Sequence, residues 1–426
     1  MKVCVVGSGG REHALALALA KSADVVATPG NPGIVGTTSE GHTLASTAAP
    51  AEEIAADLYV IGPEAPLVDG LADRLRGHGR LVFGPGADGA RLEGSKAWMK
   101  EVLARAGIPT AAHATFDTPE PALAYLRTRT GPPYVVKTDG LAAGKGVLVT
   151  SSLAEAEDDV VAKLSGTSFG AAGRRVVIEE GLAGSELSVL AVCDGKRAIP
   201  LAPARDYKRV GDGDSGPNTG GMGAFSPVPL ADGALVGRVM DEIVDPLVAA
   251  LRSDGIDYRG VLYAGLMVTG DGPKVIEFNV RFGDPEAQVV LPRYGGDLAV
   301  LLASAAAGRL PADVPPPRPT AAVCVVLAAE GYPGTPRTGD VIDGLDAAGQ
   351  VGGVQVIHAG TAHAGGHVVT AGGRILGITA EGVDLADARE RAYAAAARVS
   401  WPGVHYRRDV ALVAVDPAGT AGAKRP

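Results

Sequence analysis

The chain has 426 residues, more than one ordinary hydrophobic core organises, so we expect two to four domains. Its 46% apolar and 20% charged residues are typical of a globular enzyme, whereas a net charge of −9 with 4% aromatics argues against nucleic-acid binding. The three cysteines lack metal or disulfide spacing, and no signal-peptide pattern or apolar run of ~20 residues is visible, so we expect a cytoplasmic protein with no membrane span.

The first hundred residues alternate apolar strands with helices. Strands are predicted at 2–6, 57–61 and 80–83, each followed by a glycine-containing turn. We therefore expect a doubly wound parallel sheet of α/β class, with its ligand-binding loops at the carboxyl ends of the strands.

The first turn, residues 7–13, leads from a strand into a helix that runs to about Lys21. Its amides could bind the phosphate of a phosphorylated sugar, because glycine permits close approach and Arg11 supplies a counter-charge. The turn after the strand at 57–61 should lie beside it and offer a carboxylate to sugar hydroxyls or an amine. The candidate substrate-binding residues at this edge are Gly9, Gly10, Arg11, Pro63 and Glu64.

Two other interpretations of the first turn are open. One is a dinucleotide-binding fingerprint, but Glu12 stands in place of its third glycine and no acidic residue closes the second strand region, 25–31. The other is a tight turn without a ligand.

The middle of the chain combines helices with a mostly β layer. The clearest helix is predicted over 95–106, with Ser95 as its N-cap and Gly107 closing it. The other elements expected, in chain order, are a helix at 120–129, strands at 134–137 and 147–150, a polar helix, strands at 175–180 and 186–192, a long helix at 233–254, a strand pair over 258–281 and further helix over 284–309.

A glycine-rich loop, 140–146, follows an apolar strand that ends at Lys137. Lys137 could hold the α- and β-phosphates of a nucleotide, and Lys145 in the loop could reach the terminal phosphates. The loop lacks the spacing and the Ser/Thr of a Walker A motif, and a mobile hairpin with solvated lysines is the alternative. The strand that ends at Glu180 leads into a connector where backbone groups could contact adenine and Glu186 a ribose, although acidic strand ends without a ligand are common.

The loop over residues 206–223 combines several glycines with two cations, Lys208 and Arg209. A long structureless loop inside a compact region is usually functional or disordered. Its composition favours capture of an anion and closure over a substrate.

The most informative stretch is 274–288. As a strand, it places Glu277, Asn279 and Arg281 on one face, because side chains alternate. A carboxylate, an amide oxygen and a guanidinium suit Mg²⁺ together with phosphate oxygens. The opposite face, Ile276, Phe278 and Val280, should anchor the strand in a core. A surface strand with solvated polar residues is the alternative, which the phosphate-type loops elsewhere disfavour.

The proline-rich segment 311–319 is the best domain boundary, because such a stretch forms a stiff connector. We expect domains at 1–104, at 105–310 with a lid about 120–190, and at 320–416, followed by a frayed tail at 417–426. The C-terminal part carries no obvious chemistry, and its predicted elements are strands at 321–328, 355–359, 367–371 and 374–379 and a helix at 385–399.

The order and spacing of these motifs resemble the ATP-grasp superfamily and, more narrowly, the phosphoribosylamine–glycine ligase family. The resemblance extends over the chain up to about Val415. It implies a biotin-carboxylase-like N-terminal domain, a pair of ATP-grasp α+β subdomains with a mobile lid, and a small mixed α/β C-terminal domain. The segments that carry it are Gly7–Ala14, Gly62–Leu67, Gly94–Ala97, Lys137–Gly146, Glu179-Glu180, Gly216–Gly223 and Glu277–Gln288.

The resemblance also implies the reaction. Glycine and 5-phosphoribosylamine would be joined with ATP and Mg²⁺ or Mn²⁺, through glycyl phosphate, to give N1-(5-phosphoribosyl)glycinamide, ADP and phosphate in purine biosynthesis. The partners would be these small molecules, with no nucleic acid or membrane, and we expect a monomer.

Site residues follow from the resemblance position by position. Many ATP-grasp enzymes carry an acidic metal ligand on the preceding strand, whereas residues 263–268 have none. The catalytic residues would be Arg281, Lys145 and Asp206; the ATP-binding residues Lys96, Lys137, Gly144, Lys145, Gly146, Glu179, Glu180, Leu182 and Glu186; the metal ligands Glu277 and Asn279; and the substrate-binding residues Gly9, Gly10, Arg11, Pro63, Glu64, Asp206, Lys208, Gly220, Gly221, Gly223, Arg281 and Asp284.

Two other functional classes are open. A sibling ligase or carboxylase of nucleotide metabolism would share the phosphate chemistry, but the motif at 281–288 disfavours it. A nucleotide-sensing module without catalysis would have no need of Glu277 and Asn279 or of a complete substrate loop.

Overall fold

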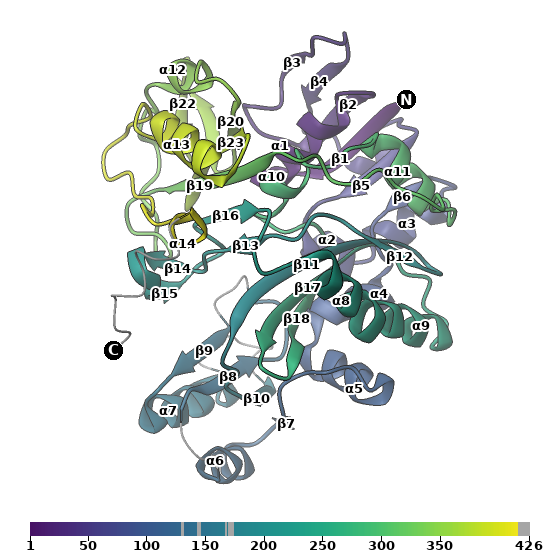
Figure 1. The fold of residues 1–426 in the computed structure, drawn as a ribbon, viewed down its shortest axis with the longest axis vertical. Helices are drawn as coiled ribbons and strands as arrows, with labels where there is room; N and C mark the ends of the chain where they lie inside the picture. Colours follow the sequence, from purple (N-terminus) through teal and green to yellow (C-terminus); the bar gives the residue numbers. More distant parts are fainter. Residues whose placement is uncertain (129–131, 143–145, 167, 169–173, 416–426) are drawn as a thin grey trace.

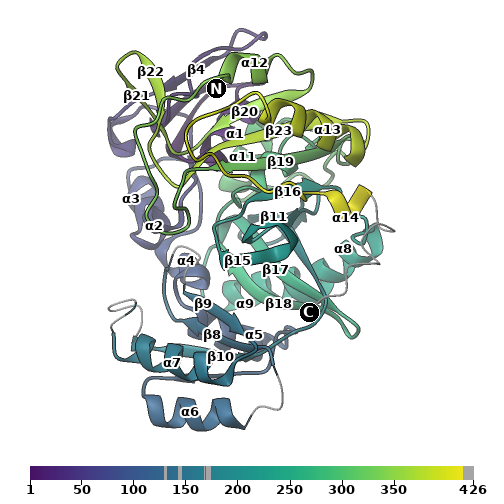
Figure 2. The same cartoon turned by 90° about the vertical axis from the view of Figure 1, so that its left-hand side faces the viewer.

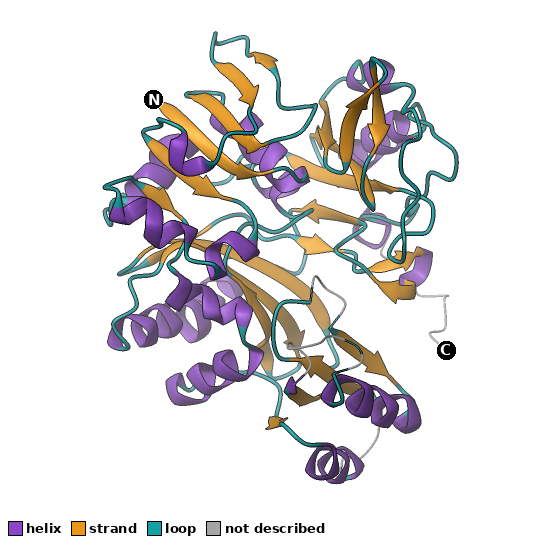
Figure 3. Ribbon diagram, turned by 180° about the vertical axis from the view of Figure 1, so that it is seen from behind, coloured by secondary structure: helices purple, strands orange, loops and turns teal. Residues whose placement is uncertain are grey.

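The computed structural model describes residues 1–426 except 129–131, 143–145, 167, 169–173 and 416–426. It has a mixed α/β architecture built on four larger sheets, and the strands of the central and C-terminal sheets alternate along the described chain (Figures 1 and 3). The predicted fold class is therefore confirmed. Within the described part of the chain, every helix is too short or too polar to cross a membrane.

The N-terminal sheet is parallel apart from one short edge strand, as expected for a doubly wound fold. Its strands lie in the order β3-β4-β2-β1-β5-β6. Because β1 and β5 are parallel neighbours, the turns that follow them lie at the same edge of the sheet. The elements are β1 Lys2–Gly7, α1 Gly10–Leu19, β2 Asp24–Pro29, β3 Gly36–Thr37, β4 Thr43–Ser46, a 3₁₀ turn Ala51–Glu53, β5 Leu58–Ile61, α2 Glu64–Val68, α3 Leu71–Gly77, β6 Val82–Phe83 and α4 Ala87–Gly94.

The helix α5, Lys96–Ala106, has the ends that the sequence predicts. The Ser95 hydroxyl accepts a hydrogen bond from the Trp98 amide at 3.2 Å, and Gly107 closes the helix in the left-handed region with a φ of 67°. The N-cap therefore fixes the start of α5 at Lys96, one of the predicted ATP-binding residues.

A small antiparallel sheet, with strand order β7-β10-β8-β9, lies at the lower end of the molecule (Figures 1 and 2). Its apolar residues form a core of their own, which includes Leu126, Val136, Val160 and Ile178. The two larger apolar clusters, by contrast, each contain residues of the N-terminal, central and C-terminal sheets. The elements are β7 His113–Phe116, α6 Pro119–Arg127, β8 Tyr134–Thr138, β9 Val147–Thr150, α7 Leu153–Leu164 and β10 Val176–Glu180.

The central antiparallel sheet has the strand order β12-β11-β17-β18. The predicted long helix at 233–254 is continuous, but its middle, Met240–Val244, is π-helical. The elements are β11 Ser185–Asp194, β12 Ala198–Pro200, α8 Gly233–Val239, α9 Asp245–Ser253, β17 Arg259–Thr269, β18 Gly272–Asn279, α10 Ala287–Val290 and α11 Leu298–Ala306.

The C-terminal sheet includes strands from both sides of the proline-rich segment 311–319. Its order is β13-β16-β19-β23-β20, and β16 pairs with β19 although the segment separates them in sequence. The C-terminal sheet therefore joins the chain before and after the predicted boundary at 311–319. The domain limits themselves stay predictions. The elements are β13 Arg205–Asp206, β14 Arg209–Gly211, a 3₁₀ turn Asp212–Asp214, β15 Ser215–Asn218, β16 Gly223–Ser226, β19 Ala321–Ala328, α12 Leu345–Gly349, β20 Val354–His358, β21 Thr361–Ala364, β22 His367–Thr370, β23 Arg374–Gly382, α13 Leu385–Ala396 and α14 Leu412–Val415.

A pair of histidines joins the N-terminal and C-terminal parts. The His13 Nδ1 atom on α1 accepts a hydrogen bond from the His358 amide on β20 at 2.8 Å. Gly33 lies against both rings: a Cβ atom there would come within 2.3 Å of His13 and 2.6 Å of His358. Burial and the nearby His358 lower the pKa of His13 to about 3, so the imidazole is neutral in the folded protein.

We predict that this contact makes the protein sensitive to acid. Below pH 6.5 the unfolded chain protonates His13, whereas the folded chain does not until about pH 3, so stability falls over this window by up to ~1.4 kcal/mol for each pH unit. His13→Asn keeps an acceptor near Nδ1 and should flatten the dependence of the unfolding free energy on pH, measured by urea denaturation. His367→Asn, at an exposed strand end, is the matched control. Equal pH slopes in the wild type and in His13→Asn would contradict the prediction.

Candidate active site

The strand β18 brings the predicted carboxylate and amide to one side of the central sheet. Glu277 and Asn279 are half-buried, while Phe278 lies in the core. The predicted apolar face is wrong at Ile276. A β-bulge opposite Gly265 and Leu266 leaves Ile276 as the extra residue, and Val275 takes its place in the core.

The charges of four cations act on Glu277. Burial alone would raise the pKa of Glu277, but Lys208, Lys137, Lys96 and Arg281 together lower it, so the carboxylate is ionised. The cations come from four segments: the start of α5, strand β8, the residues after β13 and the residues after β18. Such a concentration of positive charge around one carboxylate suits an anionic ligand that binds together with a divalent cation.

Lys137 belongs to a buried ion triad. Its Nζ atom lies 3.0 Å from Glu179 Oε1 and donates to the Ile276 carbonyl at 2.8 Å. Lys100 lies 3.2 Å from the same carboxylate and donates to Thr110. Burial lowers the pKa of Lys100 to about 8, although Glu179 opposes the shift. The Glu179 carboxylate therefore faces two lysines.

The remaining predicted nucleotide residues lie around β10 and the loop after β8. Lys96 donates to the Gly140 carbonyl at 3.2 Å. The Glu180 side chain is exposed and accepts a hydrogen bond from the Ala112 amide, and Leu182 is half-buried beyond the strand. Gly146 accepts a hydrogen bond from the Thr138 amide at 2.8 Å, while Gly144 and Lys145 lie outside the described residues.

The segment 206–223 begins with a cluster of opposite charges. Lys208 lies 3.0 Å from Glu186 and 2.8 Å from Asp206. Although burial alone would lower it, Asp206 and Glu186 raise the pKa of Lys208 well above its usual value. Burial raises the pKa of Asp206 despite this lysine. The segment is not structureless as expected, because it contains the hairpin β14–β15 with the turn glycine Gly213 at a φ of 65°.

The first turn meets the end of β18. Arg281 donates to Glu93 at 2.7 Å and to Glu64 at 3.2 Å, and Arg11 lies 4.0 Å from Glu64. The expected proximity of the two strand-end turns is therefore confirmed. Pro63 is the N-cap of α2, which starts at Glu64.

The chain's own Glu12 occupies much of this turn. Its carboxylate accepts the Gly9 amide hydrogen bond at 2.6 Å and pairs with the Arg11 side chain. A Cβ atom at Gly62 would come within 2.1 Å of the Glu12 carboxylate, so a side chain at this position would displace the carboxylate. The two groups expected to bind a phosphate here, the Gly9 amide and the Arg11 side chain, are therefore already bound to the Glu12 carboxylate.

Asp284 connects the first turn to the later glycines of 206–223. It accepts a hydrogen bond from Gln288 at 2.7 Å and lies 3.0 Å from Arg374. A Cβ atom at Gly10 would lie 3.4 Å from this aspartate. The later glycines adjoin the C-terminal part: Gly220 donates to Tyr332, Gly221 accepts from Arg374, and Gly223 in β16 pairs with Val325.

Five residues of this region were not among the site residues predicted from the sequence. Lys100 is the one with a local signal, because it lies four residues after Lys96 and so on the same face of α5. Glu286 is buried beside Tyr263, whose hydroxyl donates to it at 2.8 Å, and burial together with Asp206 raises its pKa to about 7. The five are Glu93, Lys100, Glu286, Tyr332 and Arg374.

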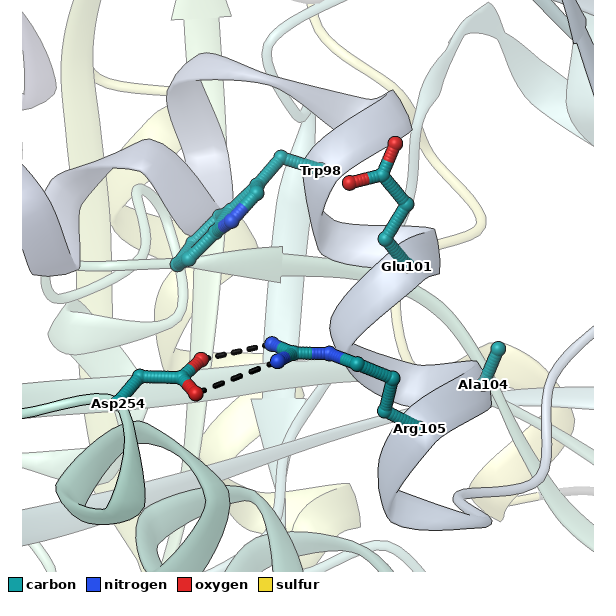
Figure 4. A pocket seen from close by; sticks show the side chains of 5 residues that line it. All are labelled: Trp98, Glu101, Ala104, Arg105 and Asp254. Carbon is teal, nitrogen blue, oxygen red and sulfur yellow. Dashed lines mark hydrogen bonds and ion pairs between the residues drawn. The ribbon is translucent and has the colours of Figure 1, made fainter.

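An open hollow of about 750 Å³ lies between α5 and Asp254, the residue that follows α9 (Figure 4). Arg105 and Asp254 meet there in a two-pronged ion pair at 2.7 and 3.2 Å. By helical spacing, Trp98 and Arg105 lie on the side of α5 opposite to Lys96 and Lys100. Among the described residues, no three His, Cys, Asp or Glu side chains are grouped to hold a metal ion. The hollow is lined by Trp98, Glu101, Ala104, Arg105 and Asp254.

We predict that Glu179→Gln lowers the free energy of unfolding by about 3 kcal/mol or more, because two buried ammonium groups then lose their carboxylate. Urea unfolding followed by circular dichroism measures the change. The control is Glu157→Gln, which breaks the solvent-accessible pair with Arg127 and should cost about 0–1 kcal/mol. Similar losses in the two variants would refute the triad as a stabilising unit.

Three family descriptions match consecutive parts of the chain. They are the N domain of phosphoribosylglycinamide synthetase at residues 1–93, its ATP-grasp (A) domain at 94–287 and its C domain at 322–413. Together they cover most of the chain.

Relatives from several bacteria that match over nearly their whole length are all named phosphoribosylamine–glycine ligase. The chain is 50% identical to a phosphoribosylamine–glycine ligase of Xanthomonas axonopodis pv. citri, over 97% of the chain and 98% of the relative. It is 51% identical to that of Streptomyces coelicolor, over 97% and 99%.

Solved structures share the fold. The crystal structure of phosphoribosylamine–glycine ligase from Thermotoga maritima has a TM-score of 0.83 and 37% identity, over 96% of this chain and 100% of that one. A biotin carboxylase domain from Hydrogenobacter thermophilus, solved with MgADP and bicarbonate, has a TM-score of 0.71 over 95% and 91% of the two chains. At 18% sequence identity, this match shows only that the two chains share a fold.

Proposed function

Because this chain belongs to the phosphoribosylglycinamide synthetase family, we propose that it ligates glycine to 5-phosphoribosylamine with ATP and that the charged cluster around Glu277 is where it does so. Family membership makes the chain an ATP-dependent ligase of purine biosynthesis with small-molecule substrates. The observation that carries the assignment of the site is that four cations from separate segments, Lys96, Lys137, Lys208 and Arg281, together keep the Glu277 carboxylate ionised.

ATP would lie between the small lower sheet and the central sheet. Lys96 and Lys137 would hold phosphate oxygens, and the glycine loop with Gly144, Lys145 and Gly146 would cover them. Glu179, Glu180 and the Leu182 backbone would lie along adenine and Glu186 beside the ribose. The contact between Glu179 and Lys137 further supports a role for this carboxylate in fixing the lysine.

The donor set of β18 fits a divalent metal ion. Glu277 is ionised despite its burial, and Asn279 offers an amide oxygen two residues further along the strand. We propose Mg²⁺, with Mn²⁺ as an alternative of similar ligand preference. When bound, the metal neutralises phosphate oxygens during transfer. The pairing of Tyr263 with Asn279 places no acidic side chain opposite this amide.

The reaction needs no protein nucleophile. A carboxylate oxygen of glycine attacks the γ-phosphorus of ATP and ADP leaves, which gives glycyl phosphate. The amine of phosphoribosylamine then attacks the acyl carbon, loses a proton and expels phosphate. Arg281 and Lys145 would neutralise the transferred group, and Asp206 would orient the amino acid.

Two substrates act as acceptors: glycine accepts the phosphoryl group and phosphoribosylamine accepts the glycyl group. We assign their binding to the edge where the first turn meets the 206–223 segment. Both acceptors would be held between the N-terminal sheet and the central sheet, where water must be excluded from glycyl phosphate. Glu12 already binds the Gly9 amide and pairs with Arg11, so the turn offers a carboxylate to ribose hydroxyls or the amine, and a phosphate bound here would have to displace that carboxylate. The residues proposed are Gly9, Gly10, Arg11, Pro63, Glu64, Asp206, Lys208, Gly220, Gly221, Gly223, Arg281 and Asp284.

We also propose a cytoplasmic monomer. The cysteines Cys4, Cys193 and Cys324 are buried free thiols, which is consistent with a reducing compartment. Sedimentation of the purified chain tests the oligomeric state. An ATPase assay in which glycine and bicarbonate compete as stimulators distinguishes this ligase from a carboxylase: bicarbonate stimulation without a glycine response would overturn the proposed function.

Glu277→Gln should reduce kcat by about 10³-fold or more, because it removes the charged metal ligand at the phosphoryl-transfer site. The melting temperature should change little, because Phe278 on the other face of the strand is untouched. Asp271→Asn, in the exposed turn of the same hairpin, is the matched control. Near-normal turnover of Glu277→Gln at saturating Mg²⁺ would rule out the metal assignment.

Gly9→Val should raise the KM for phosphoribosylamine sharply and leave the KM for ATP nearly unchanged. Gly9 has an extended backbone, with φ −82° and ψ −176°, so valine fits the chain but its Cβ atom would lie 2.9 Å from Glu12 and 3.7 Å from Asp284. Steady-state kinetics with each substrate varied measures the effect, and Gly77→Val, in open space, is the control. Tight NAD binding that Gly9→Val abolishes, with phosphoribosylamine kinetics unaffected, would support the dinucleotide alternative instead.

A further inference from the structure

The C-terminal part contacts the acceptor segment 206–223 directly, although its sequence shows no obvious chemistry. At the glycine end of the segment, the Arg374 guanidinium donates to the backbone carbonyls of Gly220 and Gly221. It also donates to the Asp284 carbonyl at 2.7 Å and lies 3.0 Å from the Asp284 carboxylate. One side chain thus holds two separate pieces of the proposed acceptor site.

Tyr332 completes this contact. Its hydroxyl oxygen accepts a hydrogen bond from the Gly220 amide at 2.9 Å, so both backbone groups of Gly220 bond to the C-terminal part. The fit is close: a Cβ atom at Gly220 would lie 3.1 Å from the Arg374 guanidinium carbon. Gly221 has a φ of 111°, and a Cβ atom there would come within 2.5 Å of Pro285. Glycine is required here because the fixed backbone leaves no room for a side chain.

The tip of the same segment has a second attachment. The buried Arg407 lies over the Tyr207 ring at 4.6 Å, donates to the Arg209 carbonyl at 3.1 Å and pairs with Asp214 at 2.8 Å. The Gly213 amide donates to the Asp409 carboxylate at 2.9 Å. Because the tip is held independently, loss of the Arg374 contacts should shift the glycine end without releasing the whole segment.

We propose that Arg374 and Tyr332 are positioning residues for the acceptor substrates, acting through Gly220, Gly221 and Asp284. The inference rests on the proposed function of these three residues. It assigns to the C-terminal part a share in binding glycine and phosphoribosylamine and none in binding ATP. Tyr332 contacts Gly220, and Arg374 contacts Gly220, Gly221 and Asp284, whereas the proposed ATP residues lie around α5, β8, β10 and the start of β11.

The test compares Arg374→Lys, Tyr332→Phe and a control in the full chain. Lysine keeps the charge but has no planar fork, and phenylalanine removes one acceptor oxygen. Arg398→Lys is the control, because Arg398 also donates to a backbone carbonyl of the C-terminal part, that of Ala347. Steady-state kinetics with ATP, glycine and phosphoribosylamine (formed in the assay from ribose 5-phosphate and ammonia) gives three KM values and kcat, and thermal unfolding gives Tm.

We expect the KM of at least one acceptor to rise about tenfold in Arg374→Lys, the loss typical of one charged hydrogen bond, and by a smaller factor in Tyr332→Phe. The KM for ATP and the Tm should stay near the wild-type values, and Arg398→Lys should match the wild type throughout. Unchanged acceptor KM values in both variants would overturn the inference. So would equal rises in all three KM values with a lowered Tm, which would mark a structural role alone. If the wild type shows no glycine-dependent ATP turnover, the proposed function fails, and the inference fails with it.

Discussion

The electrostatic environment of Glu277 is the constraint on which the proposed site depends. The charges of four cations from four segments act on this half-buried carboxylate, and these like charges repel one another in a partly desolvated site. They are held because each also has a partner of its own, such as Glu179 for Lys137 or Asp206 for Lys208. The cations are therefore oriented before a polyanion arrives, which lowers the reorganisation needed when phosphate binds.

Local rules predict the parts of this arrangement that lie on one element or one sheet edge. Period-two alternation along β18 places Glu277 and Asn279 together, and the parallel pairing of β1 with β5 brings Arg11 near Glu64. The bulge at Ile276 escapes the same rule, because one inserted residue reverses the alternation and depends on the partner strand β17.

Contacts between distant segments are what sequence patterns miss. Arg374 is separated by 90 residues from Asp284 and by more than 150 from Gly220, and nothing in its own neighbourhood indicates either partner. Glu12 illustrates a different gap. In the sequence, Glu12 replaces the third glycine of a dinucleotide-binding fingerprint. In the fold, its carboxylate accepts a hydrogen bond from the Gly9 amide, which changes the ligands that the turn can bind.

The distribution of cores suggests how the two halves of the reaction are divided. The N-terminal, central and C-terminal sheets share continuous apolar clusters, so the acceptor segment and Asp284 rest on one packed body. The small lower sheet has a separate core and meets this body partly through polar contacts such as that of Lys137 with the Ile276 carbonyl. A unit with its own core moves at less cost than one whose residues complete a shared core. We therefore propose that this sheet closes over ATP, while the acceptor side keeps the fixed geometry that the in-line attack requires.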